Sequence, residues 1–349
     1  MDFTLRPMEP SDGPALDALL TTQATATAVA MSTRYRYDVV ASLLAQHPTL
    51  YGVVATAPGV DGLVGMATAY IDEVQVEGRL FPCAHLENLK VRDDVRRQGL
   101  GRKLAEWRIA EARRRFGGEG VIVAGVEATN TGSLATARKW AGQIMGPLRI
   151  AIVPTTRKPS SIRGYRIRGI DDEDIEAVVA GSNAFHADAN LYPRLTGNRL
   201  RELLAPMDPG GTVRQYRVAV TPAGGIVAGA VVVQRFELMT DHIDRIPAPL
   251  ALANAVLHLV PEDGVIRTAE VSLPWYAPGR LHAGRHLWEE VRHEWHGRAT
   301  HLGTVVDPKS EAAEMCRVGR LTPGPRLQLM VPVSSPVALS EARPVSVWR

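Results

Sequence analysis

The sequence predicts an α+β protein in which one arrangement of strands and helices occurs twice. Three observations support this prediction. Strand-like and helix-like patterns alternate through residues 1–154. A segment with the composition of a linker follows at 155–165. Pieces of the first pattern then recur in the same order. We therefore expect one domain at 1–154, a linker at 155–165 and a second domain at 166–349.

The elements of the first half follow from local patterns. In order, we expect a strand at 3–6, a helix after Pro10, a helix at 34–46, strands at 50–56 and 63–71, a strand from His85, a helix that ends at Gly117, a strand at 121–126, a helix at 131–141 and a strand at 148–153. The run 121–126 is almost continuously apolar, as is typical of a strand that is covered on both faces.

The second half repeats three pieces of the first. Residues 166–180 repeat the strand and helix of 4–20, and 216–229 repeat the hairpin that ends at Gly65. Residues 324–332 align residue for residue with 146–154. Three matches in the same order indicate duplication. The piece Ile243–Pro261 has no counterpart in the first half, and we expect an extra helix there.

Composition excludes several classes of protein. Of the 349 residues, 45% are hydrophobic and 22% charged, as in an ordinary soluble protein, and the net charge of +3 is too small to indicate nucleic-acid binding. We expect no signal peptide, because the first residues lack a basic start and an apolar run, and no apolar stretch is long enough to span a bilayer. Cys83 and Cys316 lie too far apart for a metal or redox motif. We expect a cytoplasmic monomer or homodimer without a nucleic-acid or membrane partner.

The most informative segment, 85–104, passes from a strand through a polar loop into an amphipathic helix. Its loop reads Arg96-x-x-Gly99-x-Gly101. Backbone N–H groups at a helix start lack partners, and the helix dipole adds positive charge, so this position suits a diphosphate. The two glycines let the backbone approach phosphate oxygens without a Cβ. Formal positive charge comes from Arg96, Arg97, Arg102 and Lys103.

This loop, with Leu86-Glu87-Asn88-Leu89 before it, resembles the coenzyme A motif of the GNAT superfamily of N-acyltransferases. A dinucleotide-binding fingerprint is the alternative, but its third glycine and later acidic residue are absent. The order of elements in the first half also resembles the GNAT fold. The resemblance implies, in each half, a mixed and mostly antiparallel sheet flanked by helices. It implies acetyl-CoA or another acyl-CoA as cosubstrate, without a metal. The implied cofactor contacts are Leu89, Lys90, Val91, Arg96, Arg97, Gln98, Gly99, Leu100, Gly101, Arg102 and Asn130.

Transfer of an acyl group from a thioester to an amine needs a base for the ammonium and a donor for the carbonyl oxygen. The resemblance places the donor on the backbone of 89–91. For the base we favour Glu87, whose side chain we expect on the opposite strand face from Asn88. His85, two residues earlier on the face of Glu87, is the alternative base.

The leaving thiolate also needs a proton. GNAT enzymes often carry a tyrosine seven residues after an asparagine of the last helix. Here Asn130 is present, but Ala137 occupies the position of the tyrosine. Ser133 lies within one turn of Asn130 and is the candidate acid, although it could equally cap the helix.

The second half differs at its counterpart of the loop, 277–286. Aligned on the following helix, Gly284 matches Gly101, but His282 matches Gly99. A side chain there would obstruct a diphosphate, so we expect a degenerate copy that binds CoA weakly or not at all. The helix also carries four histidines without a zinc spacing, and we expect no metal there: His282, His286, His293 and His296.

Together these features predict an acetyl-CoA-dependent N-acetyltransferase whose acceptor is the primary amine of a small molecule. Two alternatives stay open. The chain could bind acyl-CoA without turning it over, as a sensing module, which the missing tyrosine favours. It could instead acetylate a protein amine, which an open acidic groove would favour.

Overall fold

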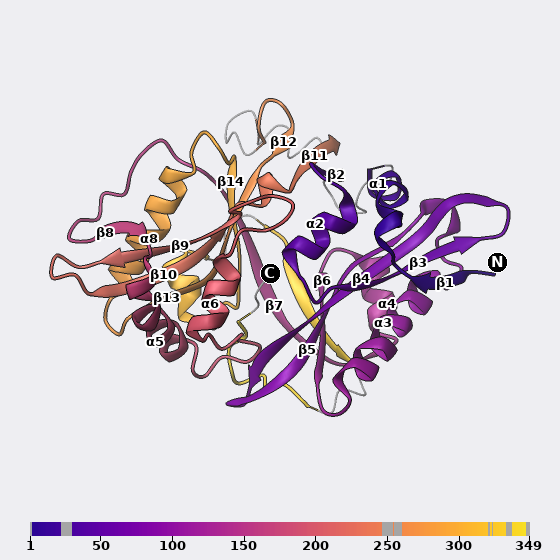
Figure 1. Cartoon of the computed structure of the whole chain (residues 1–349), viewed down its shortest axis with the longest axis horizontal. Helices are drawn as coiled ribbons and strands as arrows, with labels where there is room; N and C mark the ends of the chain where they lie inside the picture. Colours follow the sequence, from indigo (N-terminus) through magenta and orange to yellow (C-terminus); the bar gives the residue numbers. More distant parts are fainter. Residues whose placement is uncertain are drawn as a thin grey trace.

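The computed structural model describes residues 2–21, 30–245, 254, 260–319, 322, 324–332 and 337–346. They form a 12-stranded sheet flanked by helices, with a 3-stranded sheet beside it (Figure 1). Within this part of the chain, the parallel neighbours in the large sheet are β5–β6 and β13–β14, and the other neighbours are antiparallel. The predicted α+β class with a mixed, mostly antiparallel sheet is therefore confirmed.

The first half contains most of the expected elements. They are β1 (Thr4–Pro7), α1 (Gly13–Thr21), β2 (Ala30–Tyr35), α2 (Val39–Gln46), β3 (Tyr51–Ala57), β4 (Val60–Val76), β5 (Arg79–Val91), α3 (Leu100–Phe116), β6 (Val121–Glu127), α4 (Thr131–Ala137) and β7 (Ala141–Pro154). The helix expected from Arg34 was placed too early, because Arg34 and Tyr35 belong to β2. The helix starts at Val39, where the Asp38 side chain accepts a hydrogen bond from the Ala41 N–H at 3.0 Å and caps it.

The second half repeats this order with additions. Its elements are β8 (Arg166–Gly169), α5 (Ile175–Phe185), α6 (Gly197–Leu204), β9 (Arg214–Val220), β10 (Ile226–Val233), β11 (Met239–Arg245), β12 (Val265–Ile266), β13 (Thr268–Tyr276), α8 (Leu281–Glu294), β14 (His301–Val306), α9 (Glu311–Met315) and β15 (Arg326–Pro332). The helix expected at Ile243–Pro261 was wrong at its start, because 243–245 belong to β11, and most of its remainder lies outside the described residues.

The segment expected as a linker, 155–165, runs along α8 and is held there by hydrogen bonds. The Ser160 N–H donates to Glu290 Oε1 at 2.7 Å, and the Ser160 hydroxyl donates to Glu289 Oε2 at 2.9 Å. The Thr155 N–H donates to the Thr300 carbonyl oxygen at 3.0 Å. The chain thus passes from one half to the other in fixed contact with the second.

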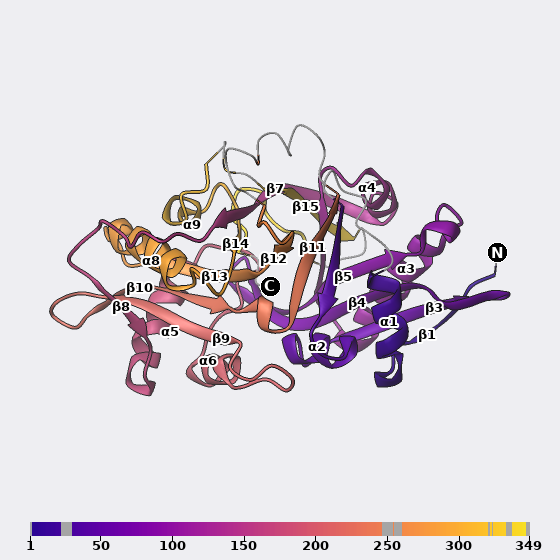
Figure 2. The same ribbon diagram turned by 90° about the horizontal axis from the view of Figure 1, so that it is seen from above.

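The two halves exchange their last strands. The order in the large sheet is β1-β3-β4-β5-β6-β15-β7-β14-β13-β10-β9-β8. β15 of the second half therefore lies beside β6, and β7 of the first half lies beside β14 (Figure 2). β7 and β15 also pair with each other, so the sheet continues without a break across both halves. The domain boundaries 1–154 and 166–349 remain a prediction. The large sheet contains strands from both of these segments.

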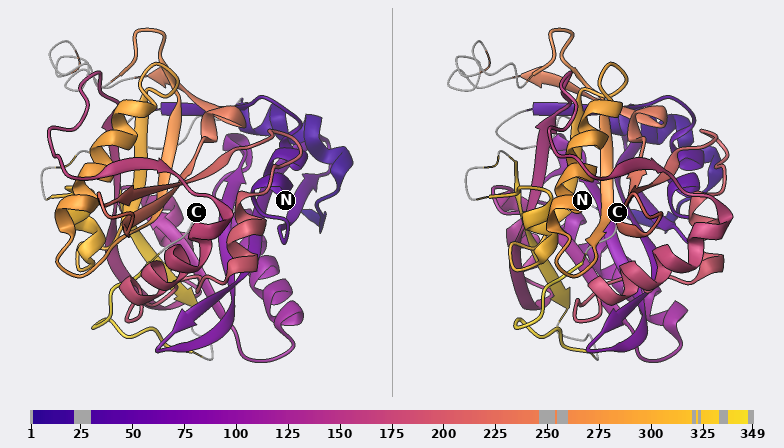
Figure 3. Two further views of the ribbon diagram at one scale, coloured as in Figure 1. Left: turned by 60° about the vertical axis from the view of Figure 1, so that its left-hand side comes forward. Right: turned by 90° about the vertical axis from the view of Figure 1, so that its left-hand side faces the viewer.

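Helices cover both faces of the sheet (Figure 3). Alternate residues of β3 point to opposite faces: Val54 packs with Leu16 of α1, and Val53 packs with Leu104 of α3. The second half has α5 and α6 on one face and α8 and α9 on the other. A further cluster joins the halves around the exchanged strands and includes Val123, Leu148, Leu327 and Leu329.

Candidate active site

A groove opens where β5 and β6 separate. The two strands pair in parallel only from Cys83–Val121 to Leu86–Ala124. Beyond that point β6 pairs with β15, as in Glu127–Leu327, whereas β5 continues beside β4. The resulting groove has a volume of about 760 Å³ and runs from the strand ends to the start of α3 and along α4.

The start of α3 has the features expected of an anion site. Gly99 is the N-cap residue with φ +87°, a left-handed conformation that side chains disfavour. A Cβ on Gly101 would lie no closer than 3.8 Å to its nearest neighbour, Leu89, so the space in front of this backbone is open. The first turn of α3 carries no acidic residue. Its unpartnered N–H groups and helix dipole therefore face the groove without a competing carboxylate.

Some of the expected positive charge is engaged within the protein. Arg96 pairs with Asp93 at 2.5 Å, and Arg102 pairs with Glu106 at 2.7 Å. Arg97, exposed and with φ +63°, forms no ion pair with any residue that the structure describes. Lys139, which the sequence analysis did not single out, also lines the groove. Arg97 and Lys139 are thus the cations best placed to meet phosphate.

The groove brings together all but one of the proposed cofactor residues. Those that line it are Leu89, Lys90, Val91, Arg96, Arg97, Gly99, Leu100, Gly101, Arg102 and Asn130. Gln98 is exposed and does not line it. Ser133 lines the groove as the third residue of α4, and its N–H donates to Asn130 Oδ1 at 3.0 Å. Asn130, not Ser133, therefore caps α4. Ala137 is buried in the groove wall.

A β-bulge on β5 changes the expected geometry of the candidate base. Glu87 pairs with Thr68 and Lys90 with Met66, so Asn88 and Leu89 together oppose a single residue of β4. Asn88 has φ +49°. The strict alternation expected for Glu87 and Asn88 is therefore wrong: both side chains line the same cavity beside the groove. The Asn88 amide donates to the Thr68 hydroxyl at 3.0 Å, which fixes its orientation.

Arg108 of α3 supports this bulge, and the sequence analysis missed it. Its side chain is 3% exposed, and its Nη1 donates to the carbonyl oxygens of Thr68 at 2.8 Å and of Glu87 at 2.6 Å. Burial lowers the pKa of Arg108 to about 10, still well above neutral pH. The available signal was a cation on the apolar face of the helix, one turn after Leu104 and one turn before Ala112.

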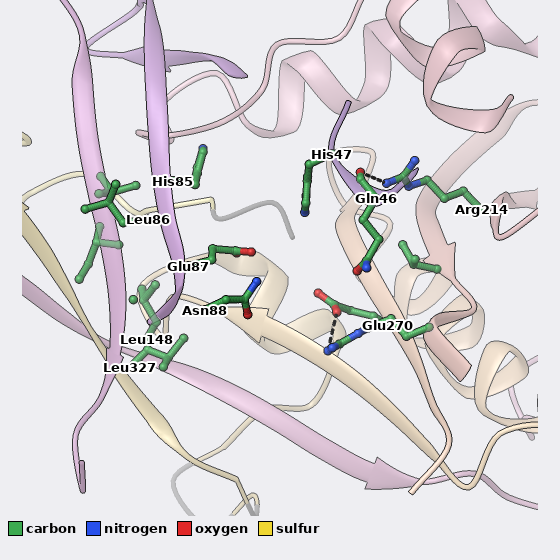
Figure 4. A pocket seen from close by; sticks show the side chains of 15 residues that line it. Gln46, His47, His85, Leu86, Glu87, Asn88, Leu148, Arg214, Glu270 and Leu327 are labelled. Atoms are coloured by element: carbon green, nitrogen blue, oxygen red, sulfur yellow. Dashed lines mark hydrogen bonds and ion pairs between the residues drawn. The ribbon is translucent and has the colours of Figure 1, made fainter. Parts of the chain in front are cut away.

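A second cavity of about 220 Å³ lies between the two halves. Leu86, Glu87, Asn88 and Gly125 line both this cavity and the groove, so the two spaces meet at the bulge. Figure 4 shows Glu87 and Glu270 extending into the cavity from opposite walls. The second half contributes Arg214, Val233, Arg235, Glu270, Leu327 and Leu329.

Aromatic rings and ion pairs order the cavity wall. His47 stacks on Tyr70 with ring centroids 3.7 Å apart, and Tyr70 stacks on His85 at 4.6 Å. Burial, with the charge of Arg214, lowers the pKa of His47 to about 3, so this imidazole is neutral near pH 7. Arg235 lies 3.8 Å from Glu270. His85, the alternative base, lines the cavity beside Glu87 as expected from its strand face.

The equivalent region of the second half is short and filled. β13 has a bulge like that of β5, with Leu273 at φ +48° in the place of Asn88. Only 277–280 then separate β13 from α8, whereas 92–99 separate β5 from α3. The N-cap of α8 is Arg280, so the predicted matches of His282 with Gly99 and of Gly284 with Gly101 were both wrong: Arg280 and His282 hold those places. A Cβ on Gly284 would lie 3.0 Å from Met315 and 3.2 Å from Tyr276.

The histidines of α8 and of the residues just after it have separate surroundings. His286 is buried, His293 lies 3.3 Å from the Thr156 carbonyl oxygen, and Arg157 Nε donates to His296 at 3.2 Å. Across the residues described, no three His, Cys, Asp or Glu side chains gather as a set of metal donors. No helix of this part of the chain is long and apolar enough to cross a membrane.

Comparisons with known proteins agree with this geometry. Residues 18–142 match the Acetyltransferase (GNAT) family. Among solved structures, N-myristoyltransferase of Saccharomyces cerevisiae with bound myristoyl-CoA is similar at 12% identity and a TM-score of 0.64, over 99% of this chain and 89% of that one. A GCN5-related N-acetyltransferase of Sphaerobacter thermophilus is similar at 15% identity and a TM-score of 0.60, over 97% and 98%. No curated protein matches significantly by sequence.

The first half of the chain thus contains a region similar to the GNAT acetyltransferases, and the solved structures share the fold of the whole chain.

Proposed function

We propose that this protein transfers an acetyl group from acetyl-CoA to the primary amine of a small molecule. The observation that carries the proposal is the junction of groove and cavity at Glu87 and Asn88. A thioester that enters through the groove and an amine that occupies the cavity would meet there. The cavity, at about 220 Å³, is below the roughly 300–1,000 Å³ of drug-sized ligand sites, which favours a small acceptor over a protein.

In this proposal the first half alone holds the cofactor. The diphosphate binds the N–H groups at the start of α3, with Arg97 and Lys139 beside it, and the pantetheine lies between the separated ends of β5 and β6. The start of α8 supports a cofactor-free second half, because Arg280 and His282 hold the places of Gly99 and Gly101 and carry side chains there. The second half then serves as one wall of the acceptor cavity.

The proposed reaction needs one base, one carbonyl donor and one acid. Glu87 takes a proton from the acceptor ammonium, and the free amine attacks the thioester carbon. A backbone N–H of 89–91, just past the bulge, stabilises the oxyanion. The C–S bond then breaks and the nitrogen loses its second proton to water. The CoA thiolate takes a proton from water, either directly or through the Ser133 hydroxyl, which water reprotonates. His85 is the alternative base.

Free-thiol release from acetyl-CoA tests this function. We expect turnover with members of a panel of small primary amines, and faster release from acetyl-CoA than from octanoyl-CoA or myristoyl-CoA. Ser133→Ala is a matched variant in the same groove. Slower thiol release in this variant is expected if Ser133 is the acid, and an unchanged rate if it is not. Release with lysine-containing peptides but with none of the small amines would contradict the proposed acceptor class. A preference for the long acyl chains would contradict the proposed donor.

A further inference from the structure

We propose that the acceptor is a small amino carboxylate, whose ammonium group binds Glu87 and whose carboxylate binds Arg214. This assignment rests on the proposed function of the cavity and specifies its substrate class. It is carried by two charged groups on facing walls of one cavity, neither of which forms an ion pair within 4.0 Å in the described part of the protein, although Arg235 and Arg108 act on Glu87 electrostatically.

Arg214 is the first of these groups. It is 9% exposed and lines the cavity from β9. Its Nη2 donates to the Gln46 carbonyl oxygen at 2.6 Å, and its Nε is buried without a hydrogen-bond partner. No carboxylate of the described residues lies within 4.0 Å of its guanidinium. A buried cation is costly unless an anion neutralises it, so an anion bound in the cavity would offset this cost.

The neighbouring cation does not share this property. Arg235 faces Glu270 at 3.8 Å, and its Nη2 also contacts the Met239 sulfur at 3.3 Å. The Glu270–Arg235 pair is therefore neutral as a unit. His47 adds no charge near pH 7, because its pKa lies at about 3. Of Arg235, His47 and Arg214 in the described cavity wall, Arg214 is therefore the cation that no carboxylate pairs with.

Glu87 is the second group. Its carboxylate forms no hydrogen bond or ion pair with any residue that the structure describes, although its backbone oxygen accepts from Arg108. Figure 4 shows Glu87 on the wall of the first half and Arg214 on the wall of the second. One negative and one positive group, separated by the cavity, are complementary to a zwitterion with its amine toward the groove.

The apolar remainder of the cavity constrains the acceptor further. Leu148, Leu327 and Leu329 also line it, so an aliphatic or aromatic carbon skeleton can pack there. Since the volume of about 220 Å³ accommodates only a small molecule, the chemistry corresponds to a single amino acid or an amino carboxylate of that size, rather than a peptide chain.

Calorimetric titration into the CoA-loaded protein tests the assignment without requiring turnover. The probes are the proteinogenic amino acids, β-alanine and 4-aminobutanoate, and for the tightest binder its decarboxylated amine and its carboxamide. We expect the amino carboxylate to bind at least about tenfold more tightly than either analogue, as for one charge-assisted hydrogen-bonded contact. Arg214→Gln should abolish this preference, and Arg214→Lys should restore part of it. Arg166→Gln, at an exposed site outside the cavity, should leave it intact.

The outcomes are distinct. Equal binding of the amino carboxylate and its decarboxylated amine by the wild type, or no binding of any probe, would overturn the assignment. If Arg214→Gln lowered the affinity for the decarboxylated amine as much as the affinity for the amino carboxylate, the assignment would also be overturned, because Arg214 would then have a structural role. A preference that depends on Arg214, without thiol release from acetyl-CoA, would support the zwitterion site while contradicting the acetyltransferase function.

Discussion

Replacement of Glu87 by Gln is expected to lower kcat/KM for acetyl transfer by about 100- to 10,000-fold, the usual contribution of a general base. The amide keeps the shape of the side chain but cannot accept the ammonium proton. Since the groove contacts of the cofactor do not require this carboxylate, the affinity for acetyl-CoA should remain close to that of the wild type. Steady-state thiol release and calorimetry on the same preparation measure the two quantities.

His85→Gln is the matched control for this prediction, because His85 lines the same cavity two residues earlier on β5. Loss of activity confined to Glu87→Gln would identify Glu87 as the base. A large loss in His85→Gln together with near-normal activity of Glu87→Gln would assign the base to His85 instead.

Replacement of Arg108 by Met should lower the free energy of unfolding by about 2–4 kcal/mol and should also impair catalysis. The change leaves the carbonyl oxygens of Thr68 and Glu87 without their donor, and each unmet buried acceptor costs about 1–3 kcal/mol. Part of this is offset, because the guanidinium no longer has to be desolvated. Loss of support for the bulge should shift Glu87 and raise KM for the acceptor.

Arg113→Met provides the control, since Arg113 lies exposed on the same helix. Urea unfolding of both variants and of Arg108→Lys, which keeps a donor, should rank Arg108→Met as the least stable. If Arg108→Met were as stable as Arg113→Met and kept its acceptor KM, the bulge would not depend on this side chain.

The conformation of the loop before α3 could be predicted from sequence because its determinants are local. Gly99 must accept φ +87°, and Gly101 must leave open space, and both requirements act within a few residues of one helix start. The direction of the Asn88 side chain could not be predicted in this way. A bulge depends on the register between β4 and β5, so the simple alternation of strand side chains misplaced Asn88 relative to Glu87.

The strand exchange could not be predicted for a related reason. β7 and β15 end in the same pattern, with Gly146-Pro147 and Gly324-Pro325 in matching places, so either strand satisfies the pairing needs of β6. The choice is made by contacts between the halves. The cavity between the halves has the same origin: Arg214 and Glu270 line it only because the second half lies against α2 and β5.

The most direct test of this account is calorimetric titration of acetyl-CoA into the wild type, Gly99→Glu and Gly59→Glu. Gly59 has φ +72° and open space around it, so its replacement reproduces the backbone strain of Gly99→Glu far from the groove. We expect one site per chain in the wild type and in Gly59→Glu, and no binding in Gly99→Glu, because a carboxylate would then face the diphosphate. Two sites per chain, or a single site that survives Gly99→Glu, would contradict the assignment of the cofactor to the first half.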